Sequence, residues 1–308
     1  MTLSFTGERF LPECQGEMVY EHWQRYLLAH GLAAGCRVLD VASGEGYGAD
    51  LIATAAGEVV GVDVSAEAVA HAASRYQRHN LRFLAASCTS IPEPEGSFDL
   101  VCSFETIEHI EAQAEFVAEV DRLLAPAGVF LLSSPNRPQY SGSSGYRNEF
   151  HIAELDREEL AALLSPRFPH QRWFAQRALF HSMLWPLERA AEGTRLVAID
   201  GTADWPEPMY FVVVAARTAD ALSRAEARLG TPIHLVSDRA HSVYAEWSRT
   251  YRENAASRQE IETLRERVAR LEARLREASQ EPASIAPPLG TEPWLVRLAR
   301  RLSGGGRG

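Results

Sequence analysis

Short apolar runs alternate with amphipathic stretches through the first two-thirds of the chain, and this alternation restricts the fold more than any other feature. The runs that predict buried strands are Val38–Val41, Val59–Val64, Leu100–Ser103, Val129–Ser133 and Tyr210–Ala215. The stretches that predict helices are Gly48–Ala55, Ala66–Arg78, Ala112–Leu124 and Asp156–Leu164. Such alternation predicts an α/β fold of right-handed βαβ units, in which helices cover both faces of a parallel sheet. Ligands of these sheets bind beyond the carboxyl ends of the strands.

The charge balance argues against one class of partner. The chain has 308 residues and a formal net charge of −10 at pH 7, whereas nucleic-acid-binding proteins present a basic face to the phosphates. We therefore expect no nucleic-acid partner.

The cysteines and the apolar segments indicate the compartment. Cys14, Cys36, Cys88 and Cys102 are widely separated and form no C-x-x-C pair, so neither a disulfide framework nor a zinc knuckle is expected. The first ten residues contain both an acid and a base and do not resemble a signal peptide. No uncharged apolar stretch is long enough to span a bilayer. These features together predict a cytoplasmic protein.

The character of the chain changes after Ala216, where the alternation ends. We expect a globular domain over residues 1–217, a helical connector over 218–252, a coiled coil over 253–280, and a linker with a short basic tail over 281–308. Within the connector, Ala219–Leu229 has a helical pattern, and the Gly-Thr-Pro sequence after it ends the helix.

In the expected coiled coil, apolar side chains recur at spacings of three and four residues. The positions are Ile261, Leu264, Val268, Leu271 and Leu275, and Glu and Arg residues flank them. This a/d heptad pattern predicts a helix through which copies of the chain associate into a homo-oligomer. A helix that packs back on its own domain along the same stripe is the alternative.

The tail has two parts. Residues 281–293 are rich in Pro and Ala, as linkers are. Residues 294–302 form a short amphipathic basic segment, which predicts contact with an anionic surface at the inner face of a membrane, or with a partner protein. A frayed end without a function is the alternative.

The first predicted strand runs into a glycine-rich turn at Val38–Ala49. Gly44 and Gly46 allow a sharp turn and a close approach of the backbone to a ligand. This spacing also fits a dinucleotide fingerprint, but Asp40 and Glu45 would repel a pyrophosphate. Acids at these positions favour a cofactor that carries a sulfonium cation and an ammonium group.

Asp63 ends the next predicted strand, about 20 residues beyond the glycines. A carboxylate at that place can accept hydrogen bonds from both hydroxyls of a ribose. A solvated acid at a strand end is the alternative, and the neighbouring glycine-rich turn favours the ribose role.

Four segments together resemble the successive motifs of class I S-adenosylmethionine-dependent methyltransferases, and the resemblance covers about residues 20–217. The segments are Val38–Ala49, Gly61–Ser65, Phe98–Glu105 and Leu123–Leu131. The resemblance implies a Rossmann-like sheet of seven strands whose last strand, Tyr210–Ala215, is reversed. It also implies that S-adenosylmethionine is held by Asp40, Ala42, Gly44, Glu45, Gly46, Asp63 and Phe104.

Two further cofactor contacts are expected. Phe83–Pro92 is similar to the family segment that usually offers a Gly-Asp pair to the adenine, and Ser87 stands where the Asp would be. Its hydroxyl can accept from the adenine amine, more weakly than a carboxylate does. The segments Gly7–Pro12 and Glu21–Leu28 resemble the lid of methyltransferases from bacterial sugar and polysaccharide pathways. Arg25 of that lid is expected to pair with the methionine carboxylate, and an exposed helix arginine is the alternative.

The candidates for chemistry follow the Leu100–Ser103 strand. Glu105, Glu108 and His109 are spaced so that a helix beginning there would place all three on one face. In one reading, His109 is the general base for an acceptor hydroxyl, and Glu105 or Glu108 orients it. In the other, the cluster binds Mg²⁺ or another divalent ion, as the similar sequence does in small-RNA 2′-O-methyltransferases and ubiquinone-pathway O-methyltransferases. Those relatives imply a further histidine, for which His151 is the candidate.

The acceptor is expected to be rich in hydroxyl groups. Asn136–Tyr146 is a polar loop with Gly and Ser, and Arg137, Tyr140 and Tyr146 add stacking and hydrogen-bonding capacity. The C-terminal coil is similar in kind to that of polysaccharide methyltransferases. We therefore expect O-methylation of a sugar in a bacterial surface glycan or its precursor. The alternatives are methylation of a lipid quinone or another small metabolite, and a scaffold without catalysis.

Overall fold

The computed structural model describes residues 17–143, 148–179, 206–230 and 242–280. Two compact units divide the chain, residues 1–243 and residues 244–308. Some residues named above lie outside the described residues: the segment Gly7–Pro12, Cys14, Tyr146 and the expected tail over 281–308.

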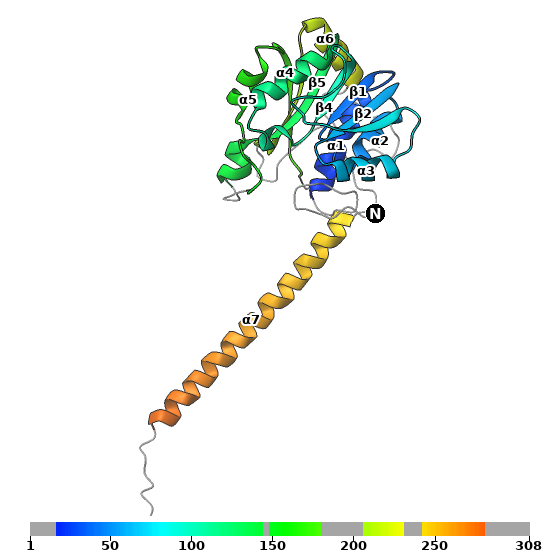
Figure 1. Ribbon diagram of the computed structural model, residues 1–308. Helices are drawn as coiled ribbons and strands as arrows, with labels where there is room; N and C mark the ends of the chain where they lie inside the picture. The colour runs from blue at the N-terminus through cyan, green and yellow to red at the C-terminus, as the bar shows by residue number, and fades with distance from the viewer. Residues whose placement is uncertain (1–16, 144–147, 180–205, 231–241, 281–308) are drawn as a thin grey trace, which may run out of the picture. The chain divides into compact units, whose positions relative to one another are not determined.

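The described part of the first unit contains one seven-stranded sheet with the order β3-β2-β1-β4-β5-β7-β6 (Figure 1). Strand β7 is antiparallel to both β5 and β6, whereas β1 to β5 are parallel to one another. The strands are β1 Arg37–Val41, β2 Glu58–Asp63, β3 Leu81–Ala85, β4 Phe98–Ser103, β5 Leu124–Pro135, β6 His170–Gln176 and β7 Tyr210–Ala216. The predicted seven-stranded sheet with a reversed last strand is confirmed.

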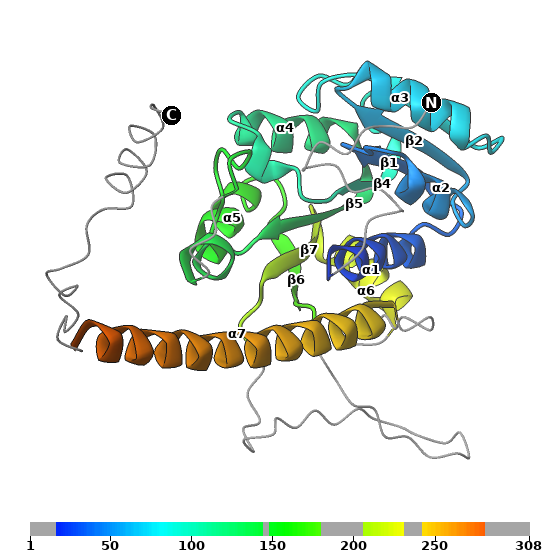
Figure 2. The ribbon, with the colours of Figure 1, turned by 90° about the horizontal axis from the view of Figure 1, so that it is seen from below.

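Helices cover both faces of this sheet (Figure 2). Side chains of α1, α2 and α6 pack on one face, and side chains of α4 and α5 pack on the other. The helices are α1 Glu17–Leu32, α2 Tyr47–Ala53, α3 Ala66–Arg75, α4 Gln113–Leu123, α5 Arg157–Leu164 and α6 Ala219–Leu229.

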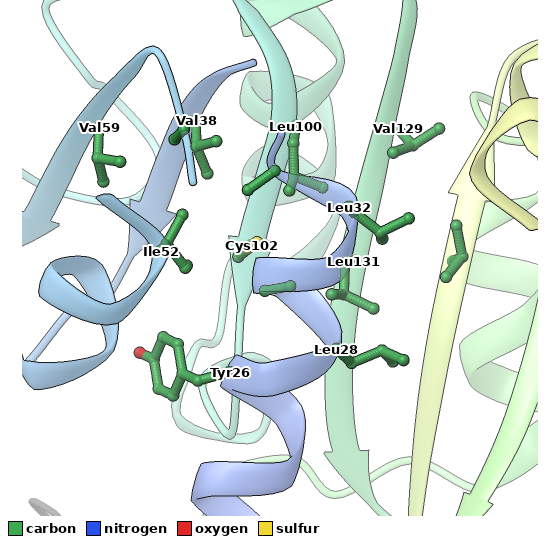
Figure 3. Close-up of a cluster of buried hydrophobic side chains, with 14 of the residues drawn as sticks. Tyr26, Leu28, Leu32, Val38, Ile52, Val59, Leu100, Cys102, Val129 and Leu131 are labelled. Carbon is green, nitrogen blue, oxygen red and sulfur yellow. The ribbon is translucent and has the colours of Figure 1, made fainter. Parts of the chain in front are cut away.

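Successive residues of the central strands enter opposite cores, since side chains alternate across a sheet. Val38 and Leu100 belong to the core on the α1 face, together with Leu28 and Leu32 of that helix (Figure 3). Leu39 and Val101, one residue further along, belong to the core on the other face. Both faces are buried, and this explains why these strands are continuous apolar runs in the sequence.

The sequence pattern did not predict α1 as a complete helix, nor β3 and β6. Strands β3 and β6 are the two edges of the sheet, and most of their residues are half-buried or exposed. An edge strand that is only partly buried does not need a continuous apolar run. The sequence pattern that would reveal such a strand is therefore weak.

Helix α6 packs on the sheet rather than leading away from it. Ala221 and Ala225 are buried in the α1 core, and Arg228 donates to the carbonyl of Leu32 at 2.7 Å. The first compact unit extends beyond residue 217, at which we expected the domain to end.

Helix α7, Ser242–Gln280, runs without interruption through 39 residues. It spans the end of the expected connector and the whole of the expected coiled coil. The five apolar residues of the heptad pattern lie on it, and each side chain is 48–70% exposed. Among the described residues, no helix is both long enough and apolar enough to cross a membrane.

Gly48, in α2, has no room for a side chain. A Cβ there would overlap the ring of Tyr26, and that ring is itself held edge-on by Tyr47 and Phe104 at centroid distances of 5.1 and 4.9 Å. We expect Gly48→Ala to lower the free energy of unfolding by about 1–3 kcal/mol, the usual cost of overpacking. Chemical denaturation measures the change.

Gly31 provides the matched control because nothing lies within 4 Å of a Cβ at that position in α1. Gly31→Ala should leave stability unchanged or raise it by up to about 1 kcal/mol, since Ala favours a helix over Gly. Equal stability of Gly48→Ala and the unmodified chain would contradict the packing described for Tyr26.

Candidate active site

The glycine-rich turn between β1 and α2 is anchored to the end of β2. The amide of Ser43 donates to the carbonyl of Val62 at 2.9 Å, and the amide of Gly44 donates to Oδ2 of Asp63 at 2.9 Å. Gly44 and Gly46 have positive φ values of 56° and 96°. The glycines are therefore required by the turn itself.

Ala42 has a φ of 60°, although it is not a glycine. A left-handed backbone costs a residue with a Cβ about 1 kcal/mol or more, and such residues concentrate at functional sites. Ala42 lies directly after β1, at the edge of the sheet where ligands of this fold bind.

Asp40 is a fully buried carboxyl group on β1. The hydroxyl of Tyr26 lies 3.3 Å from both of its oxygens and donates to this group. Burial raises the pKa of Asp40 to about 8, the Tyr26 hydrogen bond opposes the shift, and the nearby charge of Asp63 adds to it. A cation brought to this carboxyl would favour its ionised form.

Asp63 is the last residue of β2, and Ser87 follows β3. Oδ1 of Asp63 accepts from the amide of Ser65 at 2.9 Å, so both of its oxygens are oriented by backbone donors while lone pairs remain for further donors. Ser87 is exposed just beyond β3, and its Oγ lies 2.9 Å from that of Thr89. Both remain candidates for cofactor contacts.

Glu45 has a structural explanation that the sequence did not reveal. Its buried carboxylate lies 2.9 Å from Nε2 of His71 and 3.2 Å from Nη1 of Arg75, and it accepts from the hydroxyl of Tyr76 at 2.7 Å. These contacts tie the turn to α3 and its C-terminal residue. These partners explain why an acid stands at this position, and no cofactor cation is needed to explain it. A contact between Glu45 and the cofactor stays a prediction.

Glu105 is held by Arg25 and by β5. Arg25 is buried on α1, and its Nη1 lies 3.3 Å from Oε1 of Glu105 while its Nε donates to Gln176 at 2.7 Å. Ser133 donates to the Glu105 carboxylate at 2.6 Å and accepts from the Glu105 amide at 3.1 Å. Within the described residues, Nη2 of Arg25 has no hydrogen-bond partner. That nitrogen is the donor left for the predicted methionine carboxylate.

The prediction that Glu105, Glu108 and His109 share one face of a helix is wrong. Glu105 has a φ of 49°, and only a single 3₁₀ turn, η1 Ile107–His109, follows it. The left-handed residue turns the chain between the two acids. Glu105 consequently joins Arg25, whereas His109 and Glu108 join a different group.

That group consists of Glu108, His109 and His151. Each offers a ligand atom, and the three atoms lie within 4.8 Å of one another. The amides of Ile152 and Ala153 both donate to the carbonyl of Glu108, at 2.9 and 3.0 Å. These bonds fasten the segment that carries His151 to the turn that carries Glu108.

The carboxylate of Glu108 is fully buried, and within the described residues neither oxygen has a hydrogen-bond partner. Nε2 of His109 lies 3.9 Å from Oε1. Burial raises the pKa of Glu108 well above its ordinary value, and the charge of Glu105 raises it further. A buried acid without hydrogen bonds is costly, and a cation at the site would offset that cost.

The two histidines are oriented by acceptors on their Nδ1 atoms. Nδ1 of His109 lies 3.0 Å from the carbonyl oxygen of Phe150, and Nδ1 of His151 lies 2.7 Å from the carboxylate of Glu154. A carbonyl only accepts, so Nδ1 of His109 carries a proton and its Nε2 is the atom that can take one up or bind a metal.

Several residues of the site were not identified from the sequence. Tyr26 beside Asp40, Gln176 beside Arg25 and Glu154 beside His151 are all brought in by tertiary contacts. The H-x-x-E spacing of His151 and Glu154 is the one signal that could have been noticed. The ring of Tyr140 also stacks on His151, with centroids 5.1 Å apart.

Comparison with known proteins gives consistent results. Residues 39–132 match a family described as a methyltransferase domain. A probable S-adenosylmethionine-dependent methyltransferase of Mycobacterium tuberculosis H37Rv is 37% identical over 231 residues, which cover 71% of this chain and 81% of that protein. A probable S-adenosylmethionine-dependent methyltransferase of Mycolicibacterium smegmatis is 43% identical over 171 residues, and the match spans 53% of this chain and 63% of that protein.

A solved structure of a S-adenosylmethionine-dependent methyltransferase from Thermotoga maritima aligns with a TM-score of 0.49 at 18% identity, over 65% of this chain and 90% of that one. The family assignment rests on the sequence relatives and not on this likeness. With those relatives, and with the sheet order and the turn after β1 in agreement, the chain belongs to the class I S-adenosylmethionine-dependent methyltransferases.

Proposed function

We propose that this methyltransferase transfers a methyl group to a hydroxyl of a sugar in a bacterial surface glycan or its precursor. The observation that carries the O-methylation is the buried carboxylate of Glu108, which stands without a hydrogen-bond partner beside two oriented histidines. Glu108 and His109 of this group follow β4, at the same edge of the sheet as the turn after β1. An N-methylating site would not need a device that activates a hydroxyl.

The residues at the carboxyl ends of β1 and β2 fit the cofactor. Asp40 is a buried acid whose pKa is raised by burial, and a nearby cation such as the sulfonium or ammonium group would favour its ionised form. Asp63 offers oriented carboxylate oxygens to hydroxyl donors. Arg25 retains one buried donor for an anion. The charges of the cofactor and those of the site are therefore complementary.

In this proposal the cluster removes one proton from the acceptor hydroxyl. The acceptor oxygen forms a bond to the methyl carbon as the bond from that carbon to sulfur breaks, and the hydroxyl proton must leave. Nε2 of His109 is the site for that proton, because Nδ1 is already committed to the carbonyl of Phe150. The methyl donor leaves as a neutral thioether, so no charge has to be neutralised at sulfur.

A divalent ion fits the same residues. Glu108, His109 and His151 would hold it, and Glu154 would orient His151 from behind, as second carboxylates often do. When bound, such an ion would lower the pKa of the acceptor hydroxyl. The unpartnered Glu108 supports this reading over a histidine acting without a metal.

The polarity around the cluster supports a sugar acceptor. Tyr140, on the helical turn Pro138–Ser143, presents an aromatic ring and a hydroxyl beside His151, and Ser141 donates to Glu154 at 2.6 Å. Arg137 pairs with Asp156 at 2.7 Å and so stabilises the start of α5, and its contact with an acceptor stays a prediction.

The pKa of Asp40 makes cofactor binding depend on pH. The free site holds Asp40 protonated below about pH 8, and a bound cation favours the ionised form, so binding releases a proton and tightens as pH rises toward about 8. We expect the affinity of the unmodified chain for S-adenosylmethionine to increase between about pH 6 and pH 8, measured by calorimetry. Asp40→Asn should bind roughly tenfold to a hundredfold more weakly.

The slope with pH separates this role from a structural one. The ionisation of the ligand itself affects binding to both proteins equally and can be subtracted. The pH dependence that remains should be flat for Asp40→Asn, because this substitution removes the titrating group. Glu67→Gln, at an exposed position in α3, is the control and should behave like the unmodified chain. Parallel pH profiles for Asp40→Asn and the unmodified chain would refute the assignment.

Glu108→Gln tests the cluster. The substitution removes an unpartnered buried acid, so stability should hold or increase, whereas methyl transfer should fall by about a hundredfold or more. Methyl transfer and thermal unfolding are measured on the same samples, and His79→Asn, at an exposed histidine, is the control. Full activity of Glu108→Gln would exclude the cluster from catalysis.

Metal binding has its own readout. After chelation and dialysis, the unmodified chain should bind Mn²⁺, and Glu108→Gln should not. Binding is measured as a decrease in the paramagnetic resonance signal of free Mn²⁺. Activity should fall on chelation and return with Mg²⁺ or Mn²⁺. Activity that ignores chelators, with no Mn²⁺ bound, would leave His109 as a base without a metal.

The acceptor is tested by transfer of a labelled methyl group from S-adenosylmethionine. Oligosaccharide fractions of bacterial surface glycans and a hydroxylated quinone precursor are offered separately. We expect label in the glycan fraction, in an ether that resists mild alkali. Label in the quinone alone would replace the sugar hypothesis, and a chain that fails to bind S-adenosylmethionine would be a scaffold instead.

A further inference from the structure

Helix α7 presents a narrow apolar seam on an otherwise polar surface. The side chains of Ile261, Leu264, Val268 and Leu271 are 48–53% exposed, and the described side chains between them are charged or small. A polar helix of 39 residues gains little stability alone, because stable helices rely on burying one face. We therefore expect another helix to pack against this seam.

The residue types along the seam select the occupant. In the heptad register, Ile261, Val268 and Leu275 are a positions, and Leu264 and Leu271 are d positions. Two of these three a positions, Ile261 and Val268, are β-branched, and both d positions are leucine. This pattern favours two parallel strands over three or four. We infer that α7 pairs with α7 of a second copy as a parallel, in-register, two-stranded coiled coil, which makes the enzyme a dimer.

The charges beside the seam agree with that arrangement. In a parallel pair, each g residue lies near the e residue of the following heptad on the other helix. Glu253 then faces Arg258 of the partner subunit, Glu260 faces Arg265 of the partner subunit, and Arg267 faces Glu272 of the partner subunit. All three contacts join opposite charges.

An antiparallel pair that buries the same seam is less complementary, because it mixes opposite-charge contacts with like-charge contacts. There g faces g and e faces e, and the two closest registers bring arginines together. In one register Arg265 and Arg267 each face their own counterpart, although Arg258 faces Glu272 and Glu260 faces Arg274. In the other register Arg267 faces Arg274, although Arg265 faces Glu272. Like charges at these positions disfavour the antiparallel form. Within each helix, Arg265 and Glu272 make only exposed pairs 3.8 and 3.6 Å long, which a partner can exchange.

Asn254 supports the same register. It occupies the a position one heptad before Ile261, and it is exposed. A single asparagine at an a position of a coiled coil specifies alignment and strand number, because the amide is satisfied only by its counterpart in a matched pair. The seam thus carries both the apolar contacts and a device that aligns them.

Sedimentation equilibrium of the full chain tests the pairing. Across a concentration series, the unmodified chain should reach twice the mass of one chain. The double variant Leu264→Asp with Leu271→Asp should sediment as a single chain, whereas Ala273→Asp, at an exposed f position on the outer face, should remain a dimer. Cofactor binding by every variant confirms that the methyltransferase unit is folded.

Contrary results are clear. A single-chain mass for the unmodified protein at every concentration would overturn the inference, and so would a trimer or tetramer. A dimer that persists in the double aspartate variant would place the interface elsewhere in the chain.

Orientation is tested by cross-linking and by charge exchange. Under mild oxidation, Leu271→Cys should form a disulfide-linked dimer that neither the unmodified chain nor Ala273→Cys forms, since identical residues meet only in the parallel register. Arg265→Glu should weaken dimerisation by about tenfold, and adding Glu260→Arg should restore it. Failure of the second change to restore affinity, with no cross-link through position 271, would overturn the parallel arrangement.

Discussion

Burial of the central strands on both faces is the constraint on which the site depends. Helices occupy the two faces of the sheet, so in the described part of the sheet the strand ends are where polar groups can meet a ligand. The turn that begins at Ala42, the Asp63 carboxylate and the segment after β4 all occupy such ends. The same packing keeps Asp40 away from water, and burial is the main cause of its raised pKa.

A second consequence is that charge at the site is organised by tertiary contacts. Arg25 on α1 reaches Glu105 after β4, and Gln176 at the end of β6 holds Arg25 from the side. Glu108, by contrast, is left without a compensating donor among the described residues. The site thus separates two acids that are only three residues apart, one paired with a cation and the other available for an ion or an acceptor. A helix through Glu105 would have placed the two carboxylates on the same face.

The reach of the sequence pattern follows from burial. Strands β1, β2, β4, β5 and β7 were predicted because a strand covered on both sides must be apolar throughout, and α6 was predicted with the observed bounds. The edge strands β3 and β6 were missed because they can carry polar residues. Along the site, the glycine turn and Asp63 were found by spacing, since backbone conformation and strand ends leave local signals. The Tyr26 and Gln176 contacts leave none.

Glu45 and α7 mark the boundary between the two sources of information. The heptad seam of α7 is a property of residue order, because a helix places residues three and four apart on one face whatever surrounds it. The acid at Glu45 looked like a partner for a cation, yet it binds His71, Arg75 and Tyr76. Residue order reveals side-chain type and local periodicity. Which distant side chain satisfies a buried charge depends on packing, because that choice is made by contacts between segments far apart in the chain.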